Sequence, residues 1–255
     1  MKKLTITLIL CLWATSALAF PPGFIAGISR KGADAPAGDC DGIGIYSLSY
    51  NVDHTSGTTT ACTSGGTTTV TLSGTGVSVQ GTTDKYIQWT GAIDSFISAP
   101  LADTGITSQN GRFEVDVETL AILPANTIGI FEYGDQSTTA IITARFQYNA
   151  TGYLGTSPGY RLIVAHVDGT SVAGITTYVA ATINTIYHII GDWNATTGKV
   201  YAKLQAGENL SSAGVLTSFT PTISPTDPKF GERFSSNVSP QTVGFDNILT
   251  GASQQ

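Results

Sequence analysis

The sequence predicts an all-β protein, a two-sheet antiparallel β-sandwich, on three observations. Short stretches alternate between apolar and polar residues along most of the chain, which is the period of a strand with one buried face. Gly, Pro, Asn and Asp separate these stretches at the spacing of antiparallel strands. Threonine runs at residues 58–60 and 67–69 favour strands and disfavour helices. A length of 255 residues fits one large sandwich domain.

Residues 1–19 have the pattern of a secretory signal peptide. Lys2 and Lys3 precede an apolar run over 4–13, and Ala17-Leu18-Ala19 forms a small-x-small cleavage site. The run is shorter than the ~20 residues of a membrane span. We therefore expect a secreted or periplasmic protein with no membrane insertion after cleavage, and the short lysine-led signal is typical of bacteria.

The charge balance excludes two classes of partner. Loss of Lys2 and Lys3 with the signal changes the net charge from −6 to −8. An acidic domain without a basic cluster is not expected to bind nucleic acid. It also lacks the cationic face with which proteins lie on anionic lipid.

The cysteines predict one disulfide. Cys11 is removed with the signal, which leaves Cys40 and Cys62 as an even pair in an oxidising compartment. A bridge between them would close a loop of about twenty residues and stabilise the fold by about 3 kcal/mol. No Cys-x-x-Cys spacing supports a metal site here.

One domain, 39–255, follows an extended N-terminal arm or linker at 20–38 that is rich in Pro, Gly and Ala. Within the domain the alternation predicts a succession of strands. They are expected at 43–50, 68–72, 77–80, 85–90, 93–98, 111–119, 127–133, 138–148, 160–168, 176–181, 185–192, 199–205 and 243–249.

The segment 186–204 is the clearest topological marker. Two alternating strands flank Asp192-Trp193-Asn194-Ala195-Thr196-Thr197-Gly198, a turn built from Asp, Asn and Gly. An EF-hand requires its glycine one position earlier and a closing glutamate, so we interpret the segment as a plain hairpin. The strand at 243–249 ends the domain and is expected to pair with an early strand.

This order of strands resembles the concanavalin A-like lectin/glucanase superfamily, in particular its laminin-G-like and pentraxin-like members, over roughly residues 84–250. The resemblance rests mainly on the hairpin. Its residues Tyr187-His188, Asp192, Gly198 and Tyr201 occur in the order that is typical of a recurring hairpin of these proteins. The resemblance implies two curved antiparallel sheets packed as a jelly roll, with a face that meets glycans. Fold alone does not establish function.

Residues 111–119 contain the strongest local signal for chemistry. Glu114, Asp116 and Glu118 alternate with apolar residues and share one side of the strand. The laminarinase- and lichenase-type hydrolases of the superfamily carry a Glu-x-Asp-x-Glu strand, and the match implies Glu114 as nucleophile, Glu118 as acid/base and Asp116 as the group that tunes them. The alternative interpretation is a solvated acidic face without catalysis.

Other residues are candidates for binding. Aromatic rings present flat apolar surfaces to sugars, and the candidate platforms are Trp89, Tyr133, Tyr153, Tyr160 and Trp193. Jelly rolls of this kind often hold a structural calcium ion between their first and last strands. Asp53 and Asp246 have the matching residue type and position.

Three functions remain open at this point. We expect first a non-catalytic lectin-like or adhesion module that binds a polysaccharide, another glycan, or a cell-surface or matrix protein. The second is an endo-acting retaining β-glycoside hydrolase that uses Glu114 and Glu118. The third is a structural surface or matrix subunit that assembles with itself.

Overall fold

The structure is a computed structural model, and all the residues it describes belong to one compact unit within Ala35–Gln255. It describes residues 40, 43–52, 59–81, 85–90, 95–119, 127–134, 142–151, 158–168, 171–182, 184–205, 209–213, 226–232 and 243–255. The predicted signal peptide and arm lie outside the described residues, as do Asp53 and Tyr153, so these expectations stay predictions.

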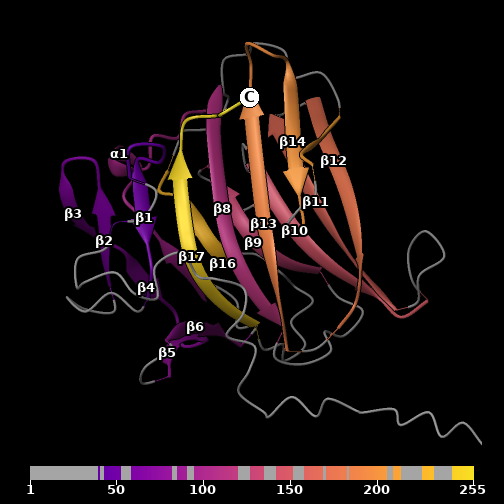
Figure 1. The fold of residues 1–255 in the computed structure, drawn as a ribbon, viewed down its shortest axis with the longest axis horizontal. Coiled ribbons are helices and arrows are strands. Elements are labelled where there is room, and N and C mark those ends of the chain that lie inside the picture. The colour runs from indigo at the N-terminus through magenta and orange to yellow at the C-terminus, as the bar shows by residue number, and fades with distance from the viewer. Residues whose placement is uncertain are drawn as a thin grey trace, which may run out of the picture. The chain divides into compact units, whose positions relative to one another are not determined.

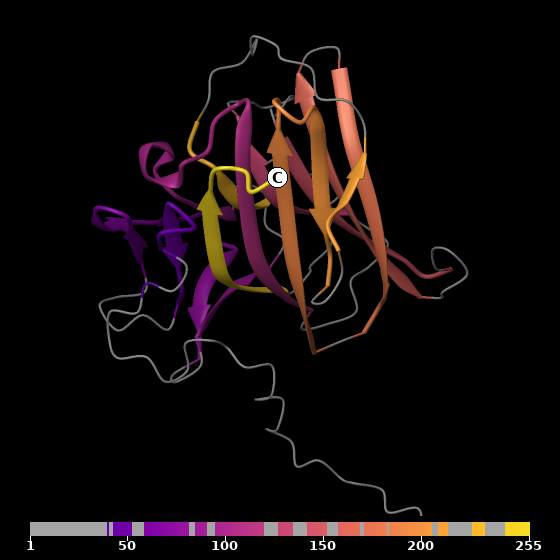
Figure 2. The same ribbon diagram turned by 45° about the horizontal axis from the view of Figure 1, so that its top comes forward.

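The chain forms two antiparallel β-sheets that pack as a sandwich, as the alternation predicted. One sheet has ten strands in the order β15-β14-β13-β8-β17-β1-β2-β3, with β6 joined to β17 and β5 to β6. The other has seven, in the order β12-β11-β10-β9-β16-β7-β4. Figure 1 shows β8, β13, β14 and β17 in the front layer with β9 to β12 behind, and Figure 2 shows both layers in a turned view.

Most elements coincide with the predicted ones to within a few residues. The strands are β1 (Leu48–Tyr50), β2 (Thr60–Thr63), β3 (Gly66–Thr69), β4 (Thr71–Ser73), β5 (Val77–Gln80), β6 (Tyr86–Trp89), β7 (Ser95–Ser98), β8 (Asn110–Thr119), β9 (Thr127–Tyr133), β10 (Ile142–Asn149), β11 (Gly159–Asp168), β12 (Ser171–Ala180), β13 (Thr185–Asn194), β14 (Lys199–Lys203), β15 (Ser211–Ala213), β16 (Lys229–Glu232) and β17 (Val243–Gly251), and the described residues include a short helix, α1 (Leu101–Thr104). Strand β13 and β14 form the predicted hairpin, and the last strand pairs with the early strands β1 and β6.

Sequence patterns did not indicate β2, β15, β16 or α1. Strand β16 is the clearest case, because its four residues contain a glycine and show no sustained alternation. It exists because β7 and β9 pair with it from either side. Helix α1 follows Pro100 and ends at Gly105, whose φ of 67° terminates it after one turn. Tertiary pairing and turn chemistry therefore override the local pattern at these elements.

The core lies between the sheets and is rich in aromatic rings. The Phe113 ring of β8 stacks on Phe131 of β9, with ring centroids 4.1 Å apart, and Phe230 packs edge-on against both. Tyr133 and Trp193 extend this cluster across the two sheets. Such rings bury large apolar areas and supply much of the driving force for folding.

Burial corrects the prediction that several aromatic residues are sugar platforms. Trp89, Tyr133, Tyr160 and Trp193 are each at most 1% exposed and belong to the core. The two indole N–H groups donate inside the protein, from Trp89 to the Ser95 carbonyl and from Trp193 to the Thr107 carbonyl. The rings fill the space between the sheets because their positions have the same parity as buried aliphatic neighbours along each strand.

Two glycines make room for this packing. Gly111 of β8 is directly opposite Trp193 of β13, and Gly191 of β13 is directly opposite Phe113 of β8. A Cβ on Gly111 would lie 2.3 Å from Trp193 Cζ2, and a Cβ on Gly191 would lie 2.1 Å from Phe113 Cε1. Each ring therefore lies over the backbone of the glycine opposite to it.

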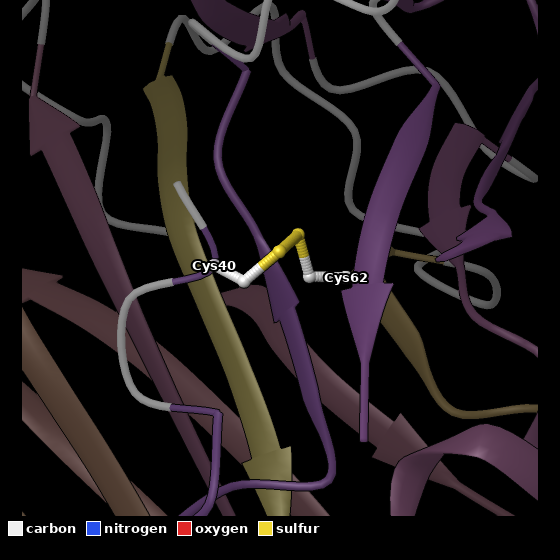
Figure 3. The surroundings of a disulfide bond; sticks show 2 residues. All are labelled: Cys40 and Cys62. Atoms are coloured by element: carbon white, nitrogen blue, oxygen red, sulfur yellow. A yellow bond between two sulfur atoms is a disulfide. The ribbon is translucent and has the colours of Figure 1, made fainter. Parts of the chain in front are cut away.

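The predicted disulfide is present. Cys40 and Cys62 are bonded, with their Cα atoms 5.4 Å apart. Cys62 belongs to β2, and Figure 3 shows the bond reaching from Cys40 to that strand. The bond therefore ties the segment before β1 to the ten-stranded sheet.

Adding one methyl group at Gly111 should test the ring-over-glycine packing. We expect Gly111→Ala to lower the free energy of unfolding by about 1–3 kcal/mol, because Trp193 has to leave its position in a packed core. Gly65→Ala is the matched control, since nothing lies within 4 Å of its added Cβ and its φ is not left-handed. Urea denaturation measures both variants, and equal stabilities would contradict this account of the core.

Removal of the disulfide should destabilise the domain without abolishing the sandwich. We expect the Cys40→Ala/Cys62→Ala double variant to lose about 3 kcal/mol of folding free energy, because the unfolded chain regains the freedom of the closed loop. Chemical denaturation of the variant and the oxidised parent measures the difference. Identical midpoints would show that the bond contributes nothing to stability.

Candidate functional site

The predicted carboxylates lie on the outer face of the ten-stranded sheet. Alternate residues of β8 point into the core, and the intervening ones, Arg112, Glu114, Asp116 and Glu118, point away from it. On this face the register of β13 brings Asp192 opposite Arg112, Ile190 opposite Glu114, His188 opposite Asp116 and Ile186 opposite Glu118. A row of charged groups from β8 thus meets His188 and Asp192 from β13.

His188 bridges two of the three carboxylates. Its Nδ1 lies 2.8 Å from Asp116 Oδ1, and its Nε2 lies 3.0 Å from Glu114 Oε2. Burial acts to lower the pKa of His188, but hydrogen bonds to Asp116 and Glu114 and their negative charges outweigh it and raise the pKa to about 9. The imidazole is therefore cationic at neutral pH and relieves the repulsion between the two carboxylates.

Glu114 is enclosed by donors. Its Oε1 accepts hydrogen bonds from Arg112 Nε at 2.8 Å and Arg112 Nη2 at 2.6 Å, and also from the Tyr46 hydroxyl. Burial acts to raise the pKa of Glu114, but the hydrogen bonds from His188 and Tyr46 and the charge of Arg112 lower it to about 2. The Glu114 side chain is 8% exposed and ionised at all ordinary pH values.

Asp192 of β13 is the last carboxylate of this network, beside Arg112. Arg112 Nη1 lies 3.3 Å from Asp192 Oδ2, and the Asp192 side chain is fully buried. The Gln254 backbone N–H donates to Oδ2 at 3.1 Å, and the Ser253 hydroxyl donates to Oδ1. Arg112 thus pairs with carboxylates on two strands, and Asp192 in turn holds residues 253–254 by hydrogen bonds.

A bulge in β17 brings an amide to Asp116. The pairing of β17 with β8 shifts between Asp246 and Leu249, and Asn247 takes a left-handed φ of 49°. Asn247 Nδ2 then donates to Asp116 Oδ2 at 2.8 Å, and Asn51 Nδ2 donates to Asn247 Oδ1 at 3.0 Å. Both Asp116 oxygens are held in place, yet 23% of this side chain is exposed.

The geometry corrects the solvated-face interpretation at Glu114, whereas Asp116 and Glu118 stay partly exposed. The Glu114 carboxylate is buried and paired with protein donors, so water does not solvate it as a surface carboxylate would be solvated. Successive residues of a strand rise by about 3.3 Å, so the Cα atoms of Glu114 and Glu118 lie about 13 Å apart, and their carboxyls would reach the roughly 5–5.5 Å of a retaining pair only if both side chains leaned towards each other.

Sequence reasoning overlooked Tyr86, although a signal for it was present. In β6, Ile87 and Trp89 face the core, so Tyr86 takes the opposite face and is half-buried. A Cβ on Gly244 would lie 3.0 Å from Tyr86 Cδ2 and 3.5 Å from Glu118 Cβ, which places the Tyr86 ring beside Glu118. The period-2 alternation alone would have assigned Tyr86, and not Trp89, to the surface.

The predicted calcium site cannot be assembled from the described residues. Asp53 lies outside them, and Asp246 Oδ1 accepts hydrogen bonds from the backbone N–H groups of Asn247 and Val52 at 2.8 and 3.4 Å. The described ranges contain no group of three or more His, Cys, Asp or Glu residues that could hold a metal ion. The role seen for Asp246 is to support the bulge, and calcium stays a prediction.

Comparisons with known proteins find similarity in structure alone. No protein-family model matches the chain, and no curated protein sequence matches it significantly. The binding domain of botulinum neurotoxin serotype D superposes with a TM-score of 0.56 at 10% identity, over 82% of this chain and 48% of that one. The serotype D/C binding domain gives 0.54 at 10% identity, over 82% and 49%. Domain 4 of a GH43 extracellular arabinanase from Geobacillus stearothermophilus gives 0.47 at 13% identity, over 82% and 94%.

These similarities concern the fold. At 10% identity the neurotoxin domains show a shared β-sandwich, and the chain spans about half of their length. Membership of the concanavalin A-like superfamily stays a prediction. No helix in the described part of the chain has the length and hydropathy that a membrane crossing requires.

The ion network should give the domain a characteristic pH dependence. The contribution of Glu114 is complete above its ordinary pKa of 4.5 and is lost as the pH falls towards about 2. The contribution of His188 is complete below 6.5 and is lost as the pH rises through about 9. We therefore expect the melting temperature to be highest between these limits, at about pH 4.5–6.5.

His188→Gln isolates the alkaline half of this profile. The variant has no imidazole to lose a proton, so its melting temperature should fall less than that of the parent between pH 6.5 and 9. Thermal unfolding followed by circular dichroism at a series of pH values measures the two slopes. If the melting temperatures of parent and variant fell equally with rising pH, protonated His188 would not be a source of stability.

Proposed function

We propose that the protein is an exported, non-catalytic glycan-binding module whose binding surface is the outer face of the ten-stranded sheet around Asp116. One observation carries the proposal. The Asp116 carboxylate is held from both sides, by His188 and Asn247, and still presents 23% of its side chain to solvent. A fixed, partly exposed acceptor is what a sugar hydroxyl requires.

The groups around Asp116 suit a sugar. Carboxylate oxygens accept hydrogen bonds from hydroxyls, and the Asn51 and Asn247 amides can both donate and accept. The half-buried Tyr86 ring beside Glu118 offers the apolar surface against which the C–H face of a sugar packs. Because the network already orders these side chains, little conformational entropy remains to be lost on binding.

The same geometry favours binding over hydrolysis. A retaining glycosidase needs one carboxyl that keeps its proton and one exposed carboxylate nucleophile. Glu114 has a pKa of about 2, which does not suit a proton donor, and its side chain is only 8% exposed, which does not suit an accessible nucleophile. The predicted signal peptide and the disulfide support an extracellular or periplasmic setting, where polysaccharides and surface glycans are available.

Binding to neutral oligosaccharides tests the proposal. A panel of glucan, xylan and mannan oligosaccharides is titrated calorimetrically against the parent, Tyr86→Ala and Asp116→Asn. We expect at least one ligand for the parent and roughly tenfold weaker binding for each variant, because Asp116→Asn loses a charged hydrogen-bond acceptor and Tyr86→Ala loses the packing surface. Tyr201→Ala is the control, because Tyr201 is a half-buried tyrosine on β14, and three strands, β13, β8 and β17, lie between β14 and the β6 strand of Tyr86.

Two results would contradict the proposal. One is binding that Tyr86→Ala and Asp116→Asn leave unchanged while their melting temperatures match the parent. The other is release of reducing ends by the parent and not by Glu114→Gln, which would establish catalysis. We expect no release of reducing ends from any member of the panel.

A further inference from the structure

The outer face of the seven-stranded sheet carries a second set of polar side chains, on β10, β11 and β12. The core-facing residues of β10 and β11, such as Ala144, Phe146 and Leu162, are fully buried. The intervening residues therefore point outward, and they include Arg145 and Gln147 on β10 and Arg161 on β11. These strands lie in the layer behind β8, the strand that contains Asp116 (Figure 1).

The strand register brings these side chains together. Arg161 is directly opposite Gln147 of β10 on one side and Tyr178 of β12 on the other. Arg145 is opposite Ile163, which makes it the diagonal neighbour of Arg161, at about 7–8 Å between Cα atoms. Arg161 Nε donates to Gln147 Oε1 at 2.5 Å, a contact that orients the plane of the guanidinium.

The charge of this patch opposes that of the whole chain. The protein has a net charge of −6, yet among the described outward side chains of β10, β11 and β12 two are arginines and none is acidic. The acidic residue next along the register is Glu132 of β9, which is opposite Thr143 and has Lys229 of β16 as its other partner. A local positive potential on an acidic protein attracts an anionic ligand to one place.

We propose that this face, formed by Arg145, Gln147, Arg161 and Tyr178, is a second binding surface and that its ligand is a carboxylated polysaccharide. The planar fork of a guanidinium matches a planar carboxylate with two parallel hydrogen bonds. Tyr178, directly opposite Arg161, adds a half-buried ring against which a sugar ring packs. Two arginines on adjacent strands give a polymer of repeated uronic acids two points of attachment on an open sheet.

The site goes beyond the neutral-glycan surface around Asp116 and does not depend on it. The two surfaces lie on different sheets and differ in chemistry, since one centres on a carboxylate and the other on two guanidinium groups. Binding at the arginine face should weaken as salt rises, because Arg145 is exposed and Arg161 is only half-buried, so salt screens their charges. Binding of neutral sugars around Asp116 should depend little on salt.

Affinity electrophoresis in gels containing polygalacturonate tests the proposal. We expect the parent to be retarded, and Arg145→Gln and Arg161→Gln each to bind roughly tenfold more weakly. Arg161→Lys keeps the charge and loses the fork, so it should also bind more weakly than the parent. Lys199→Gln removes one exposed positive charge from the other sheet and should bind like the parent. Melting temperatures confirm that each variant is folded.

The outcomes separate this proposal from its alternatives. No retardation of the parent at low salt would overturn it, and so would equal weakening by Lys199→Gln, which would indicate a response to net charge. Stronger retardation by dextran sulfate than by polygalacturonate would overturn the assignment to carboxylates. Failure of Tyr86→Ala to affect neutral oligosaccharides would instead contradict the proposed function and leave the arginine face standing.

Discussion

The ionised carboxylate of Glu114 is the constraint on which the outer face of the ten-stranded sheet depends. A buried charge without partners would lower the free energy of unfolding by several kcal/mol, which is far more than a typical surface ion pair adds to it. Here the partners come from three places in the chain, with Tyr46 preceding β1, Arg112 on β8 and His188 on β13. Since they are satisfied together only when these segments are neighbours, the charge favours this one arrangement of strands over other compact ones.

The side chains of this hydrogen-bond network are buried at one end of the face and partly exposed to solvent at the other. At one end Asp192 and Glu114 are buried and their oxygens are directed at protein donors. At the other end the chain of hydrogen bonds passes from His188 to Asp116 and on to Asn247 and Asn51, where side chains reach solvent. The buried end fixes the position of the groups at the exposed end. Among the described residues, hydrogen bonds between neighbouring strands thereby keep this polar surface rigid.

The sequence was sufficient for the sandwich and for the strand that carries the site, because period-2 alternation is local information. Alternation also selected Glu114 and Asp116, and the parity of Arg112 places it on the same face. What it did not reveal were the partners. Tyr46 and His188 reach Glu114 across 68 and 74 residues, and Asn247 reaches Asp116 through a bulge that no pattern marks. The aromatic residues were misassigned because residue type was given more weight than strand parity. Trp89 shares its face with buried Ile87.

The paired glycines of β8 and β13 have a consequence for how the chain finds its fold. The two strands are far apart in sequence, so their pairing forms late and can form in the wrong alignment. An alignment wrong by one residue would turn buried side chains to solvent and is disfavoured on that ground. An alignment wrong by two keeps every residue on its proper face, and hydrophobicity alone would tolerate it. In one such alignment Trp193 would be opposite Phe113 and two rings would compete for the same space; only the native one gives each ring a glycine. Steric selection at these two positions therefore excludes a misfolded state that burial of apolar surface would not distinguish from the native one.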